Sequence, residues 1–115
     1  MSALPPEFSH LSPFVPTWTI ATELGRNEFR TRQPYVKIKE FYDALMPCLE
    51  QITEYLNKLS LNALPRDAAN LLELALMAME VAPAVEYYQG SDVPDSVAYE
   101  KYKIFPVAPR YHVVD

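Results

Sequence analysis

Two side chains of opposite charge, Glu28 and Arg32, are the best candidates for chemistry in this chain. They lie one helical turn apart, and a helix through this stretch projects Glu28 between Leu24 and Ala21 on its apolar arc. A carboxylate on an apolar face requires a partner, because burying it alone is costly. Two interpretations follow: an ion pair that fixes how the helix docks, or a polar group that acts on a ligand inside an aromatic pocket.

A second carboxylate, Glu86, follows Pro83 and precedes Tyr87 and Tyr88. If the helix before it continues through the proline, Glu86 points toward the core. If the helix ends at Pro83, Glu86 is a loop carboxylate. We expect a structural role in preference to a functional one.

The chain has eight tyrosines, five phenylalanines and one tryptophan. Aromatic side chains most often pack a core, but several together can line a cavity for a flat apolar ligand, and tyrosine hydroxyls can orient it. The candidate ligand-binding residues are Trp18, Glu28, Arg32, Tyr42, Tyr55 and Glu86.

Metal, cofactor and thiol chemistry have little support in the sequence. It contains no phosphate-binding glycine loop and no dinucleotide fingerprint. His10 and His112 are the only histidines, and no Glu-x-x-His pair is present. Glu73 and Glu80 are expected to be solvated charges, and Cys48 a small buried hydrophobe. We therefore predict no cofactor and no metal, and favour a protein without catalytic activity.

The elements that must position these residues are predicted to be helices. The chain has 115 residues and only two glycines, and its middle is rich in strong helix formers, which favours one all-α domain over residues 1–115. Most of the prolines lie in the flanks, which predicts extended arms at 1–16 and 89–115 around a helical core at 17–88. The expected architecture is an up-down bundle of three or four helices with proline kinks and extended terminal arms.

Prolines also mark the predicted helix boundaries. The first helix is expected from an N-cap at Thr17 to about Arg32, with its Arg26 and Arg30 side outward and Trp18 as core anchor. The second is expected over 34–58 because apolar residues recur there at steps of four and three, and Pro47 should kink it or divide it into two shorter helices. The third should begin near Pro65, reach at least Ala82, and be kinked or ended by Pro83.

The third helix is apolar on nearly every side. Its few polar residues share one narrow stripe, which is interrupted by apolar side chains; the stripe comprises Arg66, Asn70, Glu73, Met77, Glu80 and Ala84. This half-apolar outer face suggests a contact with a second copy, and we predict a homo-oligomer interface that uses Leu74, Met77 and Val81. A membrane span is not expected, because two glutamates and a proline inside it would be costly in lipid.

The charge is unevenly distributed. The formal net charge is -5, and the acidic excess falls on residues 35–88, so nucleic acid is a poor candidate partner. The first residues lack the pattern of a signal peptide, and the single cysteine cannot form an internal disulfide. We therefore expect a cytoplasmic protein.

Residues 41–96 resemble a group of small uncharacterised bacterial helical proteins. The likeness is carried by Phe-Tyr-Asp at 41–43 followed by Pro47, by Leu-Pro-x-Asp-Ala at 64–68, and by Glu-Val-Ala-Pro-Ala-Val-Glu at 80–86. It implies that Pro47, Pro65 and Pro83 are regular parts of a fold, and it implies no activity.

The functional prediction is a non-catalytic accessory or protein-interaction protein that acts as a homo-oligomer. It would present an acidic helical surface and apolar arms to a protein partner. The alternative is a small-molecule binder or enzyme whose aromatic-lined cavity uses Glu28 and Arg32. A closed pocket that touches those two residues would favour the alternative.

Overall fold

The computed structural model describes residues 3–86, 111, 113 and 114, and this part of the chain is mostly helical, which confirms the all-α class. The elements in chain order are the 3-10 helix η1 (Pro6–Phe14), α1 (Val15–Trp18), α2 (Glu23–Arg32), α3 (Tyr35–Leu45), the 3-10 turn η2 (Met46–Cys48), α4 (Leu49–Asn57), β1 (Leu64–Pro65), α5 (Arg66–Glu86) and β2 (Val113–Val114).

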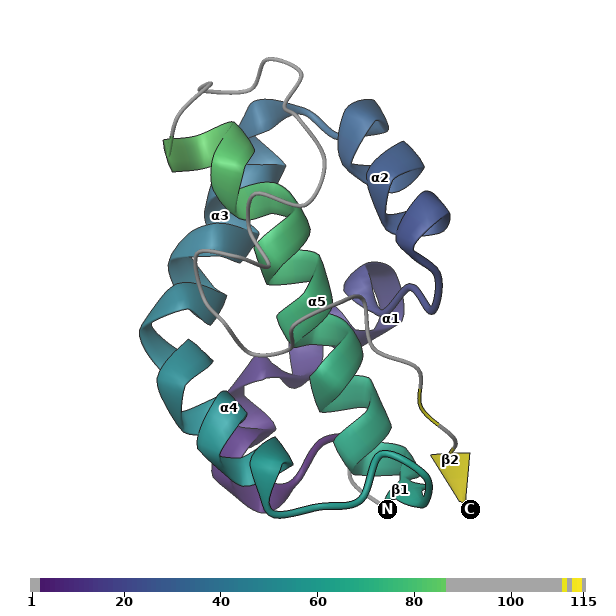
Figure 1. Ribbon diagram of the computed structural model, residues 1–115. Coiled ribbons are helices and arrows are strands. Elements are labelled where there is room, and N and C mark those ends of the chain that lie inside the picture. Colours follow the sequence, from purple (N-terminus) through teal and green to yellow (C-terminus); the bar gives the residue numbers. More distant parts are fainter. Residues whose placement is uncertain (1–2, 87–110, 112, 115) are drawn as a thin grey trace.

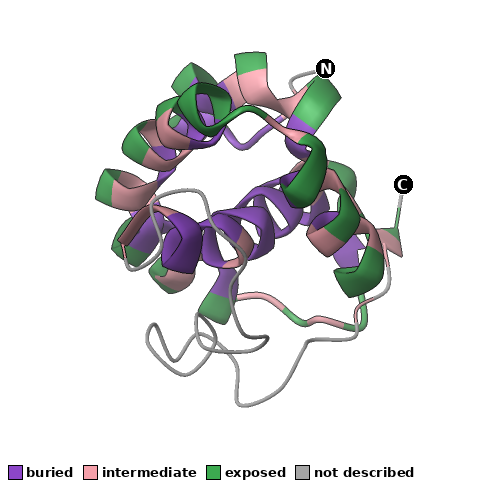
Figure 2. Ribbon diagram, turned by 90° about the horizontal axis from the view of Figure 1, so that it is seen from above, coloured by how far each residue is buried: buried purple, intermediate pink, exposed green. Residues whose placement is uncertain are grey.

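Helix α5 occupies the centre of the molecule. The chain descends through α3 and α4 and returns through α5, while α1 and α2 lie on the other side of α5 (Figure 1). Residues 71–79 of α5 are all buried, whereas the surrounding helices expose their outer faces (Figure 2). A helix that is apolar nearly all round requires such cover on every side.

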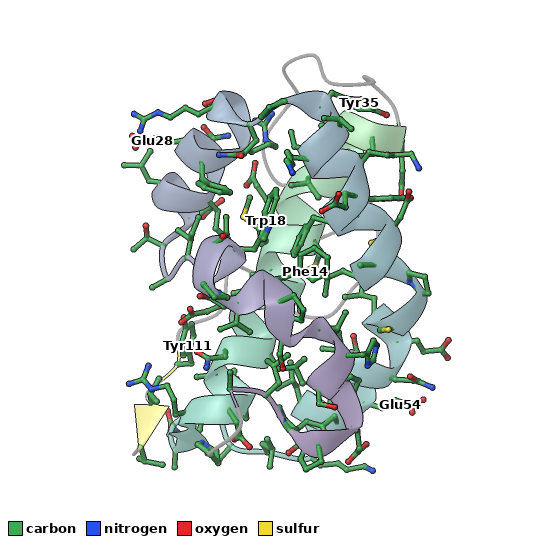
Figure 3. All side chains as sticks on the ribbon, turned by 180° about the vertical axis from the view of Figure 1, so that it is seen from behind. Phe14, Trp18, Glu28, Tyr35, Glu54 and Tyr111 are labelled. Atoms are coloured by element: carbon green, nitrogen blue, oxygen red, sulfur yellow. The ribbon has the colours of Figure 1, made fainter. Side chains whose placement is uncertain are left out.

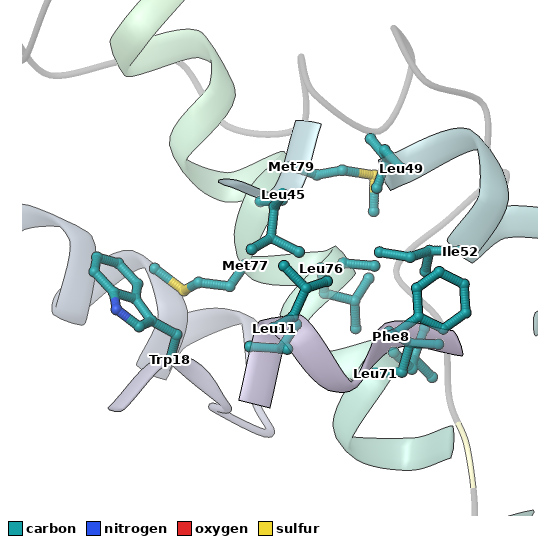
Figure 4. Close-up of a cluster of buried hydrophobic side chains, with 14 of the residues drawn as sticks. Phe8, Leu11, Trp18, Leu45, Leu49, Ile52, Leu71, Leu76, Met77 and Met79 are labelled. Atoms are coloured by element: carbon teal, nitrogen blue, oxygen red, sulfur yellow. The ribbon is translucent and has the colours of Figure 1, made fainter. Parts of the chain in front are cut away.

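The core lies where α3, α4, η1 and α1 meet α5. Leu45, Leu49 and Ile52 point inward from the α3–α4 segment, and Leu11 of η1 packs against the same cluster (Figure 4). At its other end, Trp18 stacks on Phe41 with ring centroids 4.3 Å apart and an interplanar angle of 8°. The predicted role of Trp18 as a core anchor is confirmed.

Pro47 divides the predicted second helix. Helix α3 ends at Leu45, the 3-10 turn η2 holds the proline, and α4 starts at Leu49. Proline lacks the N–H that an uninterrupted α-helix requires, so the chain tightens to 3-10 geometry at this point. The prediction of two shorter helices is therefore the correct one, and Pro34 is the N-cap of α3 and not its first residue.

The prediction of an extended N-terminal arm is wrong. Residues 6–14 form the 3-10 helix η1, and Leu4, Phe8 and Leu11 are fully or almost fully buried. Proline at the start of a helix has a favourable fixed φ, which lets Pro6 begin this element. The apolar side chains then hold η1 against the core.

The first predicted helix is broken in two. Its expected N-cap, Thr17, lies inside the short helix α1, and the true cap of α2 is Thr22, whose hydroxyl accepts a hydrogen bond from the Gly25 N–H at 3.0 Å. A Cβ atom on Gly25 would lie 2.8 Å from this hydroxyl oxygen and 2.9 Å from a methyl carbon of Ile20. Glycine at position 25 thus permits the close approach of the capping loop.

Helix α5 continues through Pro83 to Glu86. At its other end, β1 pairs in parallel with β2, with Leu64 opposite Val113. Length and composition would allow α5 to cross a membrane, yet 78% of its most apolar window is buried within the protein, a property of soluble core helices as well. Apart from residues 111, 113 and 114, the predicted C-terminal arm lies outside the described residues.

Candidate functional site

Helix α2 faces the core with the side that was predicted to face solvent. Arg26 and Arg30 are buried, whereas Glu28 and Arg32 are exposed and Leu24 is 69% exposed. Figure 3 shows Glu28 projecting away from the molecule. The predicted inward position of Glu28, and with it a pocket built on Glu28 and Arg32, is wrong.

The reason for this orientation is the polar stripe of α5. Arg30 Nε donates a hydrogen bond to Glu80 Oε2 at 2.9 Å, and the Asn27 amide donates to the same oxygen at 3.4 Å. Nearer the start of α5, the amide of Asn70 donates to the carbonyl of Ala3 at 2.9 Å. The stripe therefore docks other parts of the chain, and the prediction that Glu80 is a solvated charge is wrong.

Glu73 is the most buried carboxylate of the stripe, and its partner comes from the C-terminal residues. The hydroxyl of Tyr111 donates to Glu73 Oε2 at 2.7 Å. Burial raises the pKa of Tyr111, and the hydrogen bond to Glu73 and the charge of Glu73 raise it further, against a smaller lowering by Arg26 and Arg66. The phenol thus stays protonated and satisfies a carboxylate that was expected to be solvated.

Two of the six candidate ligand-binding residues meet. Tyr42 donates a hydrogen bond to Glu86 Oε2 at 2.6 Å, at the end of α5. Trp18 lies within the packed core, where its ring stacks on Phe41 and meets Phe29 edge to face at 5.1 Å. The six residues therefore do not line one aromatic cavity.

The predicted oligomer interface lies inside the chain. Leu74, Met77 and Val81 are each 0% exposed. The surrounding elements already cover all sides of this part of α5, as its apolar composition requires. These three residues therefore cannot contact a second copy in this fold, and the predicted interface is wrong.

A surface depression between η1 and α4 forms a groove. It has a volume of about 620 Å³ and is lined by Glu7, Phe8, Gln51, Glu54, Tyr55, Lys58 and Leu59. The rings of Phe8 and Tyr55 meet edge to face with centroids 5.8 Å apart. We call this feature the η1–α4 groove.

The η1–α4 groove was not predicted, because one of its walls was expected to be an extended arm. The pKa of Tyr55 is raised, first by burial and then by the charges of Asp67 and Glu7. Burial is the largest of these causes, and the two carboxylates add to it because a nearby negative charge disfavours the phenolate.

The fold also brings together Cys48 and His10, which are distant in the sequence. Cys48 Sγ and His10 Nε2 lie 3.4 Å apart, with the cysteine half-buried and the histidine exposed. Among the residues that the structure describes, no group of three or more His, Cys, Asp or Glu side chains is arranged to hold a metal ion.

Comparison of the chain with protein-family models, with curated proteins and with solved structures gives no match.

Proposed function

We propose that this protein is a non-catalytic interaction protein and that the η1–α4 groove is its contact surface. The groove carries the proposal, because it is a depression of about 620 Å³ with both apolar and charged lining residues. Apolar side chains with a polar rim are the usual composition of a protein contact site.

The alternative, a small-molecule binder or enzyme in an aromatic cavity, has less support. It requires Glu28 and Arg32 inside a pocket, and both are exposed. It also requires free aromatic walls, whereas Trp18 is stacked between neighbours. A lining of packed rings offers no space to a ligand.

Photo-crosslinking in the cells that make the protein tests this proposal. Gln51, which lines the groove, is replaced by p-benzoylphenylalanine, and the matched control carries the same residue in place of Glu28 on the exposed side of α2. We expect one defined protein adduct from the groove position and none from the control. Equal labelling at both positions, or no adduct at either, contradicts the proposal.

Self-association is a further part of the proposed function. Leu74, Met77 and Val81 are enclosed, so in the described part of the chain the contacts would come from the exposed large hydrophobic residues, which are Leu24, Tyr35, Val36 and Val114. Sedimentation velocity over a concentration series tests it, and a monomer at high micromolar concentration would exclude it.

We also propose that α2, α3, α4 and α5 form an up-down bundle. Support comes from the course of the chain, in which α5 runs opposite to α3 and α4 (Figure 1). The packing of α3, α4 and α2 against α5 is consistent with this arrangement.

A further inference from the structure

We infer that the occupant of the η1–α4 groove is a basic segment of a partner protein with one aromatic or branched aliphatic anchor. This inference rests on the proposed function, because it assigns the class of partner to the same groove. Its basis is the distribution of charge and apolar surface over the two walls.

Negative charge lies on both walls of the groove. Glu7 lines it from η1, and Glu54 lines it from α4, where it projects outward (Figure 3). Lys58 is the one cation among the lining residues. A segment with a lysine or arginine on either side of its anchor would place a positive charge against each wall, and such complementarity selects partners by sign.

A third carboxylate, outside the lining, also acts on Tyr55. Asp67 does not line the groove, yet its charge acts on Tyr55 together with that of Glu7. These carboxylates disfavour nucleic acids and acidic segments as occupants of the groove.

The floor of the groove is apolar. Phe8 is buried beneath it, and Tyr55 and Leu59 are half-buried. An aromatic or branched side chain would cover these three residues, and desolvated anchors of this kind supply most of the affinity at protein contacts. A small polyamine has the charge but no anchor, so it would leave this surface exposed to water.

The dimensions suit a short segment of chain. From Gln51 to the end of α4 at Asn57 the helical rise of 1.5 Å per residue gives roughly 9 Å, and the lining continues through Lys58 and Leu59. Extended chain advances about 3.3 Å per residue, so about four residues of the partner would fill it.

Selection from a phage library of random peptides, about seven residues long to exceed this span, tests the inference. The full chain is the bait, and we expect enrichment of peptides in which lysine or arginine flanks an aromatic or branched residue. The binding of selected peptides is then measured by fluorescence anisotropy. The double variant Glu7→Lys, Glu54→Lys should weaken binding about tenfold or more.

The matched control is Glu28→Lys, Glu40→Lys, which makes the same change of net charge on exposed positions of α2 and α3. It should leave peptide affinity within about twofold, since distant exposed charges are screened by salt. Leu59→Ser removes part of the apolar floor without altering any charge. It should weaken the binding of peptides with an aromatic anchor more than the binding of the same peptides with serine in place of the anchor.

Four results would overturn the inference: enrichment of acidic or uncharged peptides, no enrichment, equal losses in the two double variants, or displacement by spermidine at matched charge concentration. Self-association that the groove variant abolishes would instead assign the groove to a second copy, and would also overturn it. The crosslinking at Gln51 separates the two proposals. If crosslinking gives an adduct but the selection enriches no basic peptides, this inference alone is excluded. If crosslinking gives no adduct, the proposed function is excluded as well.

Discussion

A carboxylate and a guanidinium meet beneath α2, where the side chains of Arg30 and Glu80 are only 5% and 12% exposed. Each ion loses most of its hydration there, and their attraction has to offset that loss. Such a pair contributes little compared with an apolar contact of the same size, but removing one member leaves the other charge buried. The pair therefore makes the docking of α2 sensitive to single substitutions.

Replacing Glu80 by glutamine tests this sensitivity. Glu80→Gln keeps the size of the side chain and leaves the Arg30 charge without its counter-ion, so we expect a loss of about 3 kcal/mol in the free energy of unfolding, measured with urea. The control is Asp43→Asn, because the Lys39–Asp43 pair is 45% and 56% exposed. That substitution should cost less than about 1 kcal/mol, and equal losses would contradict the prediction.

Tyr111 should make stability depend on alkaline pH. Its pKa in the folded chain is raised above the ordinary value of 10.0, so folding favours the protonated phenol. The stability that this shift contributes is complete below pH 10 and is lost as the pH rises from there through the folded pKa. Unfolding free energies measured from about pH 8 upward should therefore fall once the ordinary pKa is passed.

Tyr111→Phe isolates this contribution. The variant should lose about 1 kcal/mol near neutral pH, because the hydrogen bond to Glu73 is removed, and its alkaline decline should be shallower. Tyr55, whose pKa is also raised, keeps part of the decline in both proteins. Identical slopes above pH 10 would show that Tyr111 does not cause the decline.

At the scale of elements, α2 depends on its cap. The Thr22 hydroxyl satisfies the Gly25 N–H at the start of this exposed ten-residue helix. Thr22→Ala should therefore cost about 1 kcal/mol of unfolding free energy. Thr31→Ala is the control, since its hydroxyl only donates to the Glu28 carbonyl within the same helix. Its cost should stay within about 0.5 kcal/mol, and a reversed order would exclude capping as the cause.

The proline boundaries were predictable from the sequence. Pro34 lies immediately before α3, Pro47 lies in the 3-10 turn, and Pro65 immediately precedes α5. Each follows from a local property, the fixed φ and missing N–H of proline, which neighbouring elements do not change. The continuation of α5 through Pro83 depends on packing, and the sequence left both outcomes open.

The orientation of α2 was not predictable in the same way. Periodicity shows which residues share a face, but it does not show what that face meets, and Arg26 and Arg30 were assigned to water by their type alone. Both are buried, and Arg30 binds Glu80 of α5. Polar stripes on two predicted helices could have indicated that they dock on each other, since buried charges require partners.

The η1–α4 groove was missed for a related reason. Its η1 side belongs to a stretch whose prolines indicated extended backbone, although Leu4, Phe8 and Leu11 recur there at steps of four and three. That spacing was the available signal of a helical, buried segment.

At the scale of the whole molecule, α5 is enclosed by elements from both sides of it in the sequence. The chain therefore uses its most apolar helix to build its own core, and any contact with a second copy must use the outer helices. A substitution at Met77 distinguishes core packing from association, because this residue was predicted at an interface and is fully buried.

Met77→Ala should act on stability and not on association. A buried methionine replaced by alanine leaves a cavity, which should cost about 2–5 kcal/mol of unfolding free energy. The sedimentation coefficient of the folded variant should equal that of the parent chain. Leu24→Ala, at a 69% exposed position, should change stability by less than about 0.5 kcal/mol. If Met77→Ala leaves stability unchanged and alters the sedimentation coefficient, this prediction is contradicted and an interface at Met77 is supported.

The contact between Tyr111 and Glu73 also has a consequence for biosynthesis. Tyr111 is translated after every residue of α5, and β1 can pair with β2 only after Val113 has been synthesised. A chain truncated before Tyr111 would therefore lack the phenol that donates to Glu73 of α5. It would also lack Val113, the partner of Leu64 in the β1–β2 pair, so premature termination removes two contacts made by the last residues of the chain.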